Sequence, residues 1–264
     1  MSKHEENIFA EERKQLIVDL VNEQVKTTVA DLCQAFSVSP ATIRNDLREL
    51  EFAGLLKRTH GGAMSNKKVT FDMPYQDRLV ERKAEKQAIG KLAAEMVREG
   101  DKIIIDVGTT TIELAMYIAE VPNITIVTSD LEVAYYMNAH SSANILVTGG
   151  FLRSKFNSLF GQVALQAMEG ITVDKAFISA EGFTPEKGAT NTDPNIAQLK
   201  SKYVECAEQV IILCDHAKLG KSAFMKFADV GEVDLLITDE NADMELVEQL
   251  RNKGVEVELA QIEQ

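Results

Sequence analysis

The stretch SPATIRNDLRELEFAGLLKRTHGG, residues 39–62, decides the fold, because it contains a helix start, a helix and a glycine pair. Ser39 followed by Pro40 predicts the start: a serine hydroxyl can accept a backbone N–H bond at the N-cap, and proline has no N–H to leave unsatisfied at the first helical position. Gly54 is expected just past the end, since glycine readily adopts the left-handed conformation that commonly ends a helix. We therefore predict one helix between Ser39 and Gly54.

This helix has two different faces. Ile43, Leu47 and Leu50 recur at helical spacing, which predicts a buried face. Arg44 and Arg48 project elsewhere, toward solvent or toward a partner. Because charges on an exposed helix face are most often only solvated, the helix alone leaves both interpretations open.

The neighbouring segments complete a larger pattern. Apolar residues at helical spacing predict a first helix over residues 10–24, and VADLCQAF, residues 29–36, predicts a second. After the third helix, residues 55–64 contain a short extended segment and a glycine pair, which fits a β-hairpin. Three helices followed by a hairpin are the order of a winged helix-turn-helix, so we predict a small domain of this fold over residues 8–65.

The polar residues of this domain suit contact with double-stranded DNA. The major groove admits a helix whose early residues reach base edges, while a wing can lie against phosphates or the minor groove. The candidate DNA-binding residues come from the helix starts, the polar face of the third helix and the wing: Thr28, Ser39, Thr42, Arg44, Asn45, Arg48, Lys57, Arg58 and His60.

The formal net charge of −13 does not exclude nucleic acid, because the charge is unevenly distributed. Residues 1–68 hold ten Lys and Arg against ten Asp and Glu, whereas residues 69–264 hold 18 against 31. Between residues 39 and 68, six basic residues outnumber three acidic ones. A locally positive segment of an acidic chain can approach a polyanion through that segment alone.

The remaining bulk properties narrow the class of protein. The 264 residues include no run of about 18 apolar residues, so we predict no membrane span. The charged N-terminus lacks an apolar signal core, which predicts a cytoplasmic location. Cys33, Cys206 and Cys214 are expected to be free thiols. Because no histidine or cysteine spacing fits a metal site, we expect neither a metal nor a cofactor.

The rest of the chain predicts a linker and a second domain. Residues 66–78 mix charge with Pro74 and show little periodicity, which predicts the linker. Over residues 79–264 apolar strands alternate with helical patterns, which predicts a Rossmann-like α/β domain with a mostly parallel sheet and helices on both faces. The expected strands cover residues 102–106, 124–129, 144–148, 175–179, 209–214, 234–238 and 255–260.

Ligands of parallel sheets bind beyond the carboxyl ends of the strands. The residues at these positions are of types that together suit one ligand, a phosphorylated sugar. DVGTTT, residues 106–111, opens into a helix, where a close backbone approach at Gly108, threonine hydroxyls and free N–H groups favour a phosphate. Basic residues after other strands could neutralise it, and carboxylates could accept bonds from sugar hydroxyls. The candidate effector-binding residues are Asp106, Gly108, Thr109, Thr110, Thr111, Thr128, Gly149, Gly150, Arg153, Glu181, Lys200, Asp215 and Lys218.

Several of these motifs together resemble a known family. SPATIRNDLRELEFAGLLKRTHGGA, Ser39 to Ala63, closely resembles the signature of the DeoR family of bacterial transcriptional regulators. The resemblance continues through DVGTTT, through GGFLR at 149–153 and through DHAKLG at 215–220, and so covers almost the whole chain. It implies that the C-terminal half has a fold like that of ribose 5-phosphate isomerase and binds a phosphorylated sugar as an effector.

The sequence also departs from the family pattern at a few positions. Asn45 stands where the family often has a second arginine, which suggests a different operator preference. Ser129 and Asp130 stand where Asn and Ser are common, and Ser179 stands where Gly is common. The last three lie near the expected pocket, so they bear on which sugar is selected.

We therefore expect a DNA-binding repressor of a carbohydrate catabolism or uptake operon. It would act as a homo-oligomer on a double-stranded operator, under the control of a phosphorylated sugar. The alternative is a sugar-phosphate isomerase with Glu181 or Asp215 as base and Lys200 or Lys218 as electrophile. LGKS at 219–222 imitates the end of a P-loop, but Asp215 stands where the first glycine should be, so nucleotide hydrolysis is not expected. A DNA-binding protein with an inert body would leave the polar residues after the strands unexplained.

Overall fold

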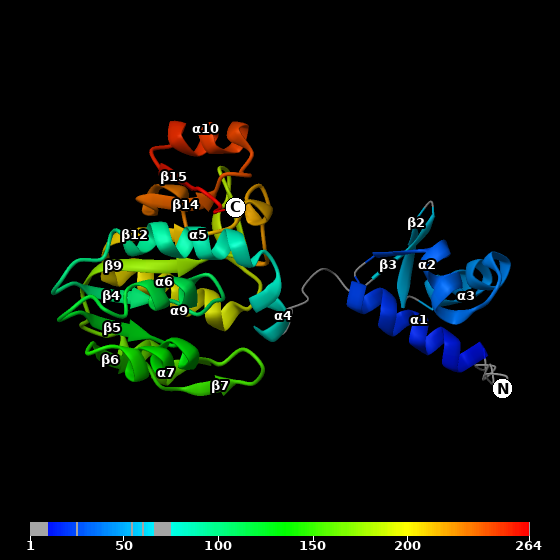
Figure 1. The fold of residues 1–264 in the computed structure, drawn as a ribbon, viewed down its shortest axis with the longest axis horizontal. Helices are drawn as coiled ribbons and strands as arrows, with labels where there is room; N and C mark the ends of the chain where they lie inside the picture. Colours follow the sequence, from blue (N-terminus) through cyan, green and yellow to red (C-terminus); the bar gives the residue numbers. More distant parts are fainter. Residues whose placement is uncertain (1–9, 25, 54, 60, 66–74, 264) are drawn as a thin grey trace. The chain divides into compact units, whose positions relative to one another are not determined.

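The computed structural model of the chain describes residues 10–24, 26–53, 55–59, 61–65 and 75–263. By its internal contacts the chain divides into two compact units, Met1–Asp72 and Met73–Gln264 (Figure 1). No helix within the described ranges has both the length and the apolar character that crossing a membrane requires.

The N-terminal unit confirms the expected helix-turn-helix with a β-hairpin. Strand β3 pairs antiparallel with both β1 and β2, so the hairpin β2–β3 is extended by a strand that lies between the first two helices in sequence. The position of Gly54, which we expected to follow the third helix, lies outside the described residues. The elements are α1 (Ala10–Gln24), β1 (Lys26–Thr28), α2 (Val29–Phe36), α3 (Pro40–Phe52), β2 (Leu56–Thr59) and β3 (Gly62–Ser65).

The helices of this unit pack around one small core. Ile17 of α1, Leu32 of α2 and Ile43 and Leu47 of α3 are at most 1% exposed. Burying side chains of this size stabilises a domain by about 1.5–3 kcal/mol each. Ser37 between α2 and α3 has a left-handed backbone with φ of 52°, and this turn sets the direction in which α3 begins.

The C-terminal unit is built on a seven-stranded sheet in which every neighbouring pair is parallel, which confirms the predicted α/β class. The spatial order is β15-β14-β12-β9-β4-β5-β6. From β4 the chain moves outward one way through β5 and β6, and then returns to place β9 on the other side of β4. The strands are β4 (Lys102–Ile105), β5 (Thr125–Thr128), β6 (Asn144–Val147), β9 (Val173–Ser179), β12 (Ala207–Leu213), β14 (Leu235–Asp239) and β15 (Glu256–Ala260).

Helices cover both faces of this sheet (Figure 1). Because successive strand residues point to opposite faces, Ile103 and Ile105 of β4 lie in one buried cluster and Ile104 lies in the other. Buried residues from three helices join each cluster. The helices on the first face are α5 (Lys83–Ala94), α6 (Thr111–Tyr117) and α7 (Leu131–His140), and those on the second are α8 (Gln162–Ala167), α9 (Pro194–Cys206) and α10 (Met244–Asn252).

Short elements that we did not predict lie around the strand ends. A hairpin joins β7 (Phe151–Arg153) to β8 (Ser158–Phe160), and a second antiparallel sheet has the order β10-β11-β13. Helix α4 (Tyr75–Val80) begins inside residues 66–78, the range expected to be a linker, of which 66–74 lie outside the described part. The remaining elements are β10 (Gly182–Thr184), β11 (Gly188–Asn191), β13 (Met225–Ala228) and the short 3-10 turns His216–Lys218 and Val230–Glu232.

Candidate functional site

Helix α3 presents its polar face to solvent. Its start is fixed as expected, because Ser39 Oγ accepts from the Thr42 N–H at 3.2 Å and Pro40 follows at the first helical position. Arg44 and Arg48 are exposed, and among the described residues no carboxylate forms an ion pair with either guanidinium. Both are therefore available to an external anion or to base edges.

Ion pairs on the other side of α3 attach it to α1. Asp46 is 4% exposed, and its carboxylate accepts from the Arg13 guanidinium at 2.8 Å. Glu49 accepts from Lys14 at 3.0 Å and from the Asn45 side-chain amide at 2.9 Å. The predicted contact residue Asn45 is thus held by its own helix, while its exposed position leaves it within reach of a partner.

The other predicted DNA-binding residues divide between helix caps and the wing. Thr28 caps α2 by accepting from the Asp31 N–H at 3.2 Å, so its hydroxyl already has a structural role, as that of Ser39 does. Lys57 and Arg58 of β2 are exposed. His60 lies outside the described residues. All nine remain predicted DNA contacts. The exposed Arg44 and Arg48 of α3 are the best-placed cations, whereas Arg58 of the wing lies 3.9 Å from Glu51.

In the C-terminal unit a narrow cleft lies where the strand order reverses. Chain segments leave β4 and β9 at their carboxyl ends and diverge there, which is the position at which open α/β sheets bind ligands. Polar side chains from both segments, from the β7–β8 hairpin, from α9 and from α4 border it. The lining residues are Tyr75, Arg78, Val107, Gly108, Arg153, Phe156, Ser158, Ser179, Ala180, Glu181, Asn191, Ile196 and Lys200.

A buried ion pair forms the floor of this cleft. Lys200 Nζ lies 2.6 Å from Asp106 Oδ2, and both side chains are at most 3% exposed. Ser179 completes the group: its backbone N–H and its hydroxyl lie 3.0 Å from the same carboxylate oxygen, and its carbonyl accepts from Lys200 at 2.6 Å. Two predicted effector residues are therefore brought together from positions 94 residues apart. The serine that departs from the family pattern joins them.

The DVGTTT loop contributes less of the cleft wall than the sequence suggested. Gly108 borders the cleft, and a Cβ added there would lie 3.1 Å from Ser179 Oγ, so glycine permits the close approach of the two loops. Thr109, Thr110 and Thr111 are at most 2% exposed and are not among the residues that border the cleft. Their predicted contact with a phosphate stays a prediction.

Behind this loop lies a buried carboxylate. Asp130 caps α7 by accepting from the Glu132 N–H at 2.8 Å, and it also accepts from the Gly108 N–H at 3.2 Å. Burial raises the pKa of Asp130 to about 7, although these N–H donors act in the opposite direction. Thr128, another predicted effector residue, is fully buried and accepts from the Asp130 N–H. Asp130 therefore holds the backbone of the loop at Gly108, and Thr128 holds Asp130. Neither residue lines the cleft.

The segment after β6 brings one predicted residue into the cleft. Arg153 borders it, lies 3.3 Å from Asp193 and has its guanidinium 3.9 Å from the centre of the Phe156 ring. Gly149 and Gly150, predicted with it, precede the hairpin and are not lining residues. Glu181 does line the cleft, and its carboxylate accepts from the Thr192 N–H at 2.7 Å.

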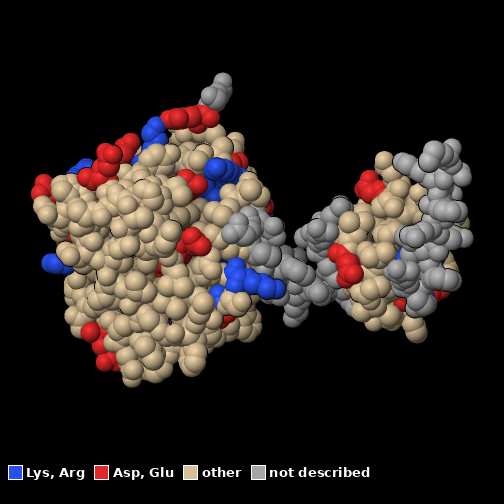
Figure 2. All heavy atoms as spheres, turned by 60° about the horizontal axis from the view of Figure 1, so that its bottom comes forward, with Lys and Arg blue, Asp and Glu red and all other residues tan. Residues whose placement is uncertain are grey.

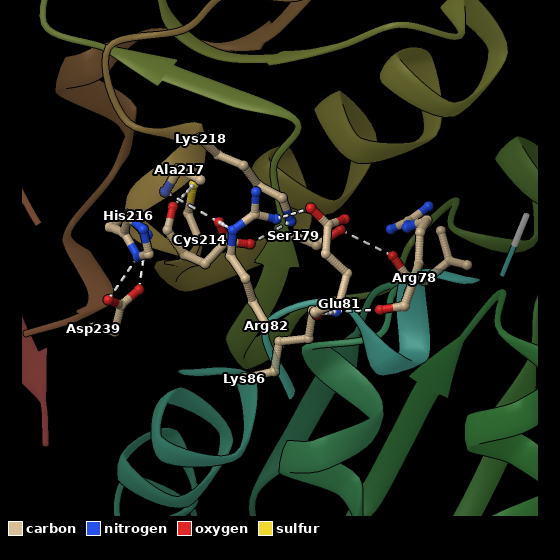
Figure 3. A network of polar contacts seen from close by, with 12 residues as sticks. Arg78, Glu81, Arg82, Lys86, Ser179, Cys214, His216, Ala217, Lys218 and Asp239 are labelled. Carbon is tan, nitrogen blue, oxygen red and sulfur yellow. Dashed lines mark hydrogen bonds and ion pairs between the residues drawn. The ribbon is translucent and has the colours of Figure 1, made fainter. Parts of the chain in front are cut away.

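Asp215 and Lys218 do not line the cleft. Lys218 lies in a polar network with Arg82 and Lys86 that reaches the cleft residue Arg78 (Figure 3). Lys218 Nζ lies 3.2 Å and Arg82 Nε lies 4.0 Å from the Asp215 carboxylate. Burial alone would raise the pKa of Asp215, but Lys218, Arg82 and Lys86 outweigh burial and leave that pKa lowered. Burial and then Lys218 lower the pKa of Lys86 to about 8. This network joins α5 to the turn after β12.

Sequence reasoning missed Tyr75 and Arg78 as residues of the cleft, because residues 66–78 were expected to be a linker. It also missed Ser158, whose hydroxyl is buried in the cleft wall and has no hydrogen-bond partner among the described side chains and backbone. The sequence signals for these residues were weak. Tyr75 follows a proline, which is typical of a linker, and Ser158 lies in a strand of only three residues, too short for an apolar pattern to predict.

A second, more open hollow of the C-terminal unit is lined by Leu92, Glu95, Met96, Arg98, Lys175 and Glu258. On the face shown in Figure 2, acidic and basic side chains of the C-terminal unit are scattered among uncharged ones. Within the described ranges no group of three His, Cys, Asp or Glu side chains could hold a metal ion. Cys206 and Cys214 are buried free thiols and Cys33 is a half-buried one.

Two protein-family models match the chain. The DeoR-like helix-turn-helix domain matches residues 13–69, and the DeoR C-terminal sensor domain matches residues 81–240. These ranges contain α3 and the wing in the first case and most of the cleft in the second. Helix α4 lies between them.

Known transcriptional regulators match this chain over nearly its whole length. The HTH-type transcriptional regulator GlpR of Haloferax volcanii is 36% identical over 246 residues, which cover 93% of this chain and 96% of that protein. The HTH-type transcriptional repressor GlcR of Bacillus subtilis is 32% identical over 250 residues, covering 95% and 96%. Among solved structures, ribose 5-phosphate isomerase A of Methanocaldococcus jannaschii is similar over 51% of this chain and 53% of that one, with 14% identity and a TM-score of 0.38.

Proposed function

Because this chain belongs to the DeoR family of DNA-binding transcriptional regulators, we propose that it represses a carbohydrate catabolism or uptake operon and that a phosphorylated sugar controls its operator binding. Its full-length relatives are regulators and not enzymes, so the isomerase alternative is set aside. Membership of the family does not identify the effector. We infer that it is a phosphorylated sugar and that it weakens operator binding.

The observation that carries the proposal is the composition of the cleft at the reversal of strand order. Three cations, Arg78, Arg153 and Lys200, and one carboxylate, Glu181, border it. Guanidinium groups are well suited to phosphate because they donate in a planar fork, and a carboxylate and free hydroxyls suit the hydroxyl groups of a sugar. Ser158, whose buried hydroxyl has no hydrogen-bond partner within the described residues, supplies such a group in the cleft wall. A phosphorylated sugar uses all of these features at once.

On the DNA side, α3 would lie in the major groove. Arg44 and Arg48, exposed and without a described carboxylate partner, would reach base edges or phosphates, and Lys57 and Arg58 would meet the backbone from the wing. One such unit reads few base pairs, so the active form would be a homo-oligomer with two α3 helices about 34 Å apart, one turn of DNA. Analytical ultracentrifugation of the full chain at the concentration used for DNA binding tests this part.

Effector binding would lower DNA affinity only through a difference between two states. A sugar phosphate that prefers the state with misplaced α3 helices reduces operator affinity by its differential affinity for the two states. Coupling free energies of about 1–3 kcal/mol are usual, which correspond to about 5- to 150-fold in affinity.

The experiment is an operator-binding titration. A DNA site selected with the full chain from a random pool is labelled, and its affinity is measured by fluorescence anisotropy with a panel of sugar phosphates and with the matching unphosphorylated sugars. We expect at least one phosphate, and not its unphosphorylated partner, to weaken binding by about fivefold or more. If no compound of a broad panel changes the affinity, the sensing half of the proposal is wrong.

A further inference from the structure

Helix α4 forms part of the cleft wall. Tyr75 and Arg78 from this helix border the cleft together with Gly108, Arg153 and Lys200. Tyr75 is 5% exposed and its N–H donates to the Lys155 carbonyl at 3.3 Å, so the start of the helix is anchored to the β7–β8 hairpin. A molecule in the cleft therefore contacts the helix that follows directly on the chain leading from the N-terminal unit.

The carboxyl end of α4 is held by a lysine of the next helix, α5. Lys86 of α5 is 4% exposed, and its ammonium group donates to the backbone carbonyls of Arg78 and Glu81 (Figure 3). A cation at the carboxyl end of a helix satisfies carbonyls that have no partner within the helix. Because Lys86 holds the backbone of Arg78, the guanidinium of that residue is carried on a positioned segment at the cleft.

Arg78 differs from the other two cations of the cleft in its electrostatic partners. Lys200 is neutralised by Asp106 at 2.6 Å, and Arg153 lies 3.3 Å from Asp193. For Arg78, no carboxylate among the described side chains lies within ion-pair distance. An anion that enters the cleft must compete with a carboxylate for the first two cations, whereas no carboxylate among the described side chains competes for Arg78.

We propose that Arg78 is the residue that binds the phosphate group of the effector, and that ligand occupancy thereby stabilises α4 further. The identity of the ligand as a sugar phosphate rests on the function proposed above, but the anion contact itself does not. A guanidinium donates two parallel bonds to a phosphate, and a charge-assisted bond of this kind at a half-buried residue is among the stronger polar contacts. The residue links the cleft to the first helix after the N-terminal unit.

The test uses inorganic phosphate as the probe and the full chain as the protein. Phosphate affinity is measured by isothermal titration calorimetry, with sulfate as a second anion, for wild type, Arg78→Ala, Arg78→Lys and Lys253→Ala. The last variant removes the same charge from an exposed position at the end of α10, so it controls for net charge. We expect Arg78→Ala to weaken phosphate binding about 10- to 100-fold, Arg78→Lys to fall between it and wild type, and Lys253→Ala to match wild type.

A second readout follows α4 itself. Amide hydrogen exchange of residues 75–80 in the wild type should slow when phosphate is added, and in Arg78→Ala it should not respond. Wild-type phosphate binding that is unchanged in both Arg78 variants overturns the inference, and so does the absence of phosphate binding by wild type. If Arg78→Ala loses phosphate while no sugar phosphate alters operator affinity of the wild type, the Arg78 contact stands and the proposed function fails.

Discussion

The buried ion pair between Lys200 and Asp106 should contribute strongly to the stability of the C-terminal unit. Replacing Lys200 by Met keeps most of the side-chain volume and removes the ammonium group that lies 2.6 Å from Asp106. Both side chains are at most 3% exposed, so water cannot replace the lost partner without rearrangement. Removing one member of a buried pair typically costs about 3–5 kcal/mol. Because Ser179 still donates to the Asp106 carboxylate, we expect Lys200→Met to lower the free energy of unfolding by about 3 kcal/mol, the low end of this range.

The assay is urea unfolding of the full chain followed by circular dichroism, fitted for the transition of the C-terminal unit. Lys202→Met is the matched control: it makes the same substitution on the same helix, at an exposed i,i+3 ion pair with Glu205, and should change little. The double variant Asp106→Asn/Lys200→Met should recover part of the loss, because no unpaired charge remains buried. If Lys200→Met and Lys202→Met were equally stable, the ion pair would not hold the cleft floor as we argue.

Three further predictions concern other parts of the chain. Arg44→Ala should weaken binding to a selected operator by about 1–3 kcal/mol in an anisotropy assay, whereas Arg251→Ala should not; equal affinities would mean that α3 does not face DNA. Asp130 keeps its proton up to about pH 7 when folded but loses it near 3.8 when unfolded, so wild-type stability should fall as pH rises between these values. Across that window wild type should lose on the order of 4 kcal/mol relative to Asp130→Asn in urea unfolding, and parallel pH profiles would refute this. Gly90→Ala, which in an exposed helix would stabilise, should destabilise by about 1–3 kcal/mol, because its Cβ would lie 2.7 Å from Glu113 Cβ; a rise in the thermal midpoint would contradict this packing.

The sequence predicted the elements whose local pattern is strong. The helix start at Ser39 and Pro40 and the apolar spacing of Ile43 and Leu47 are signals within a few residues, and the structure has the cap and the buried face that they predict. The apolar strands of the parallel sheet were equally clear, since strands buried on both faces appear as continuous runs of Ile, Val and Leu.

What could not be predicted depends on contacts between distant residues. Helix α4 has six residues and no periodic face, and it is held by the burial of Tyr75 and by Lys86, which caps its carboxyl end. The pairing of Lys200 with Asp106 requires the strand order, which a single sequence does not contain. The same holds for the absence of Asp215 and Lys218 from the cleft lining, although all of these residues follow carboxyl ends of strands or lie on the next helix.

We propose above that ligand binding in the cleft and operator binding are thermodynamically linked, so that each weakens the other. The most direct measurement of this linkage is a reciprocal titration: the affinity for the active sugar phosphate is determined by calorimetry with and without saturating operator DNA, and the operator affinity is determined with and without saturating sugar phosphate. Linkage requires both affinities to fall by the same factor, which we expect to be about 5- to 150-fold. A sugar phosphate that binds equally well to the free and the DNA-bound protein would contradict the account.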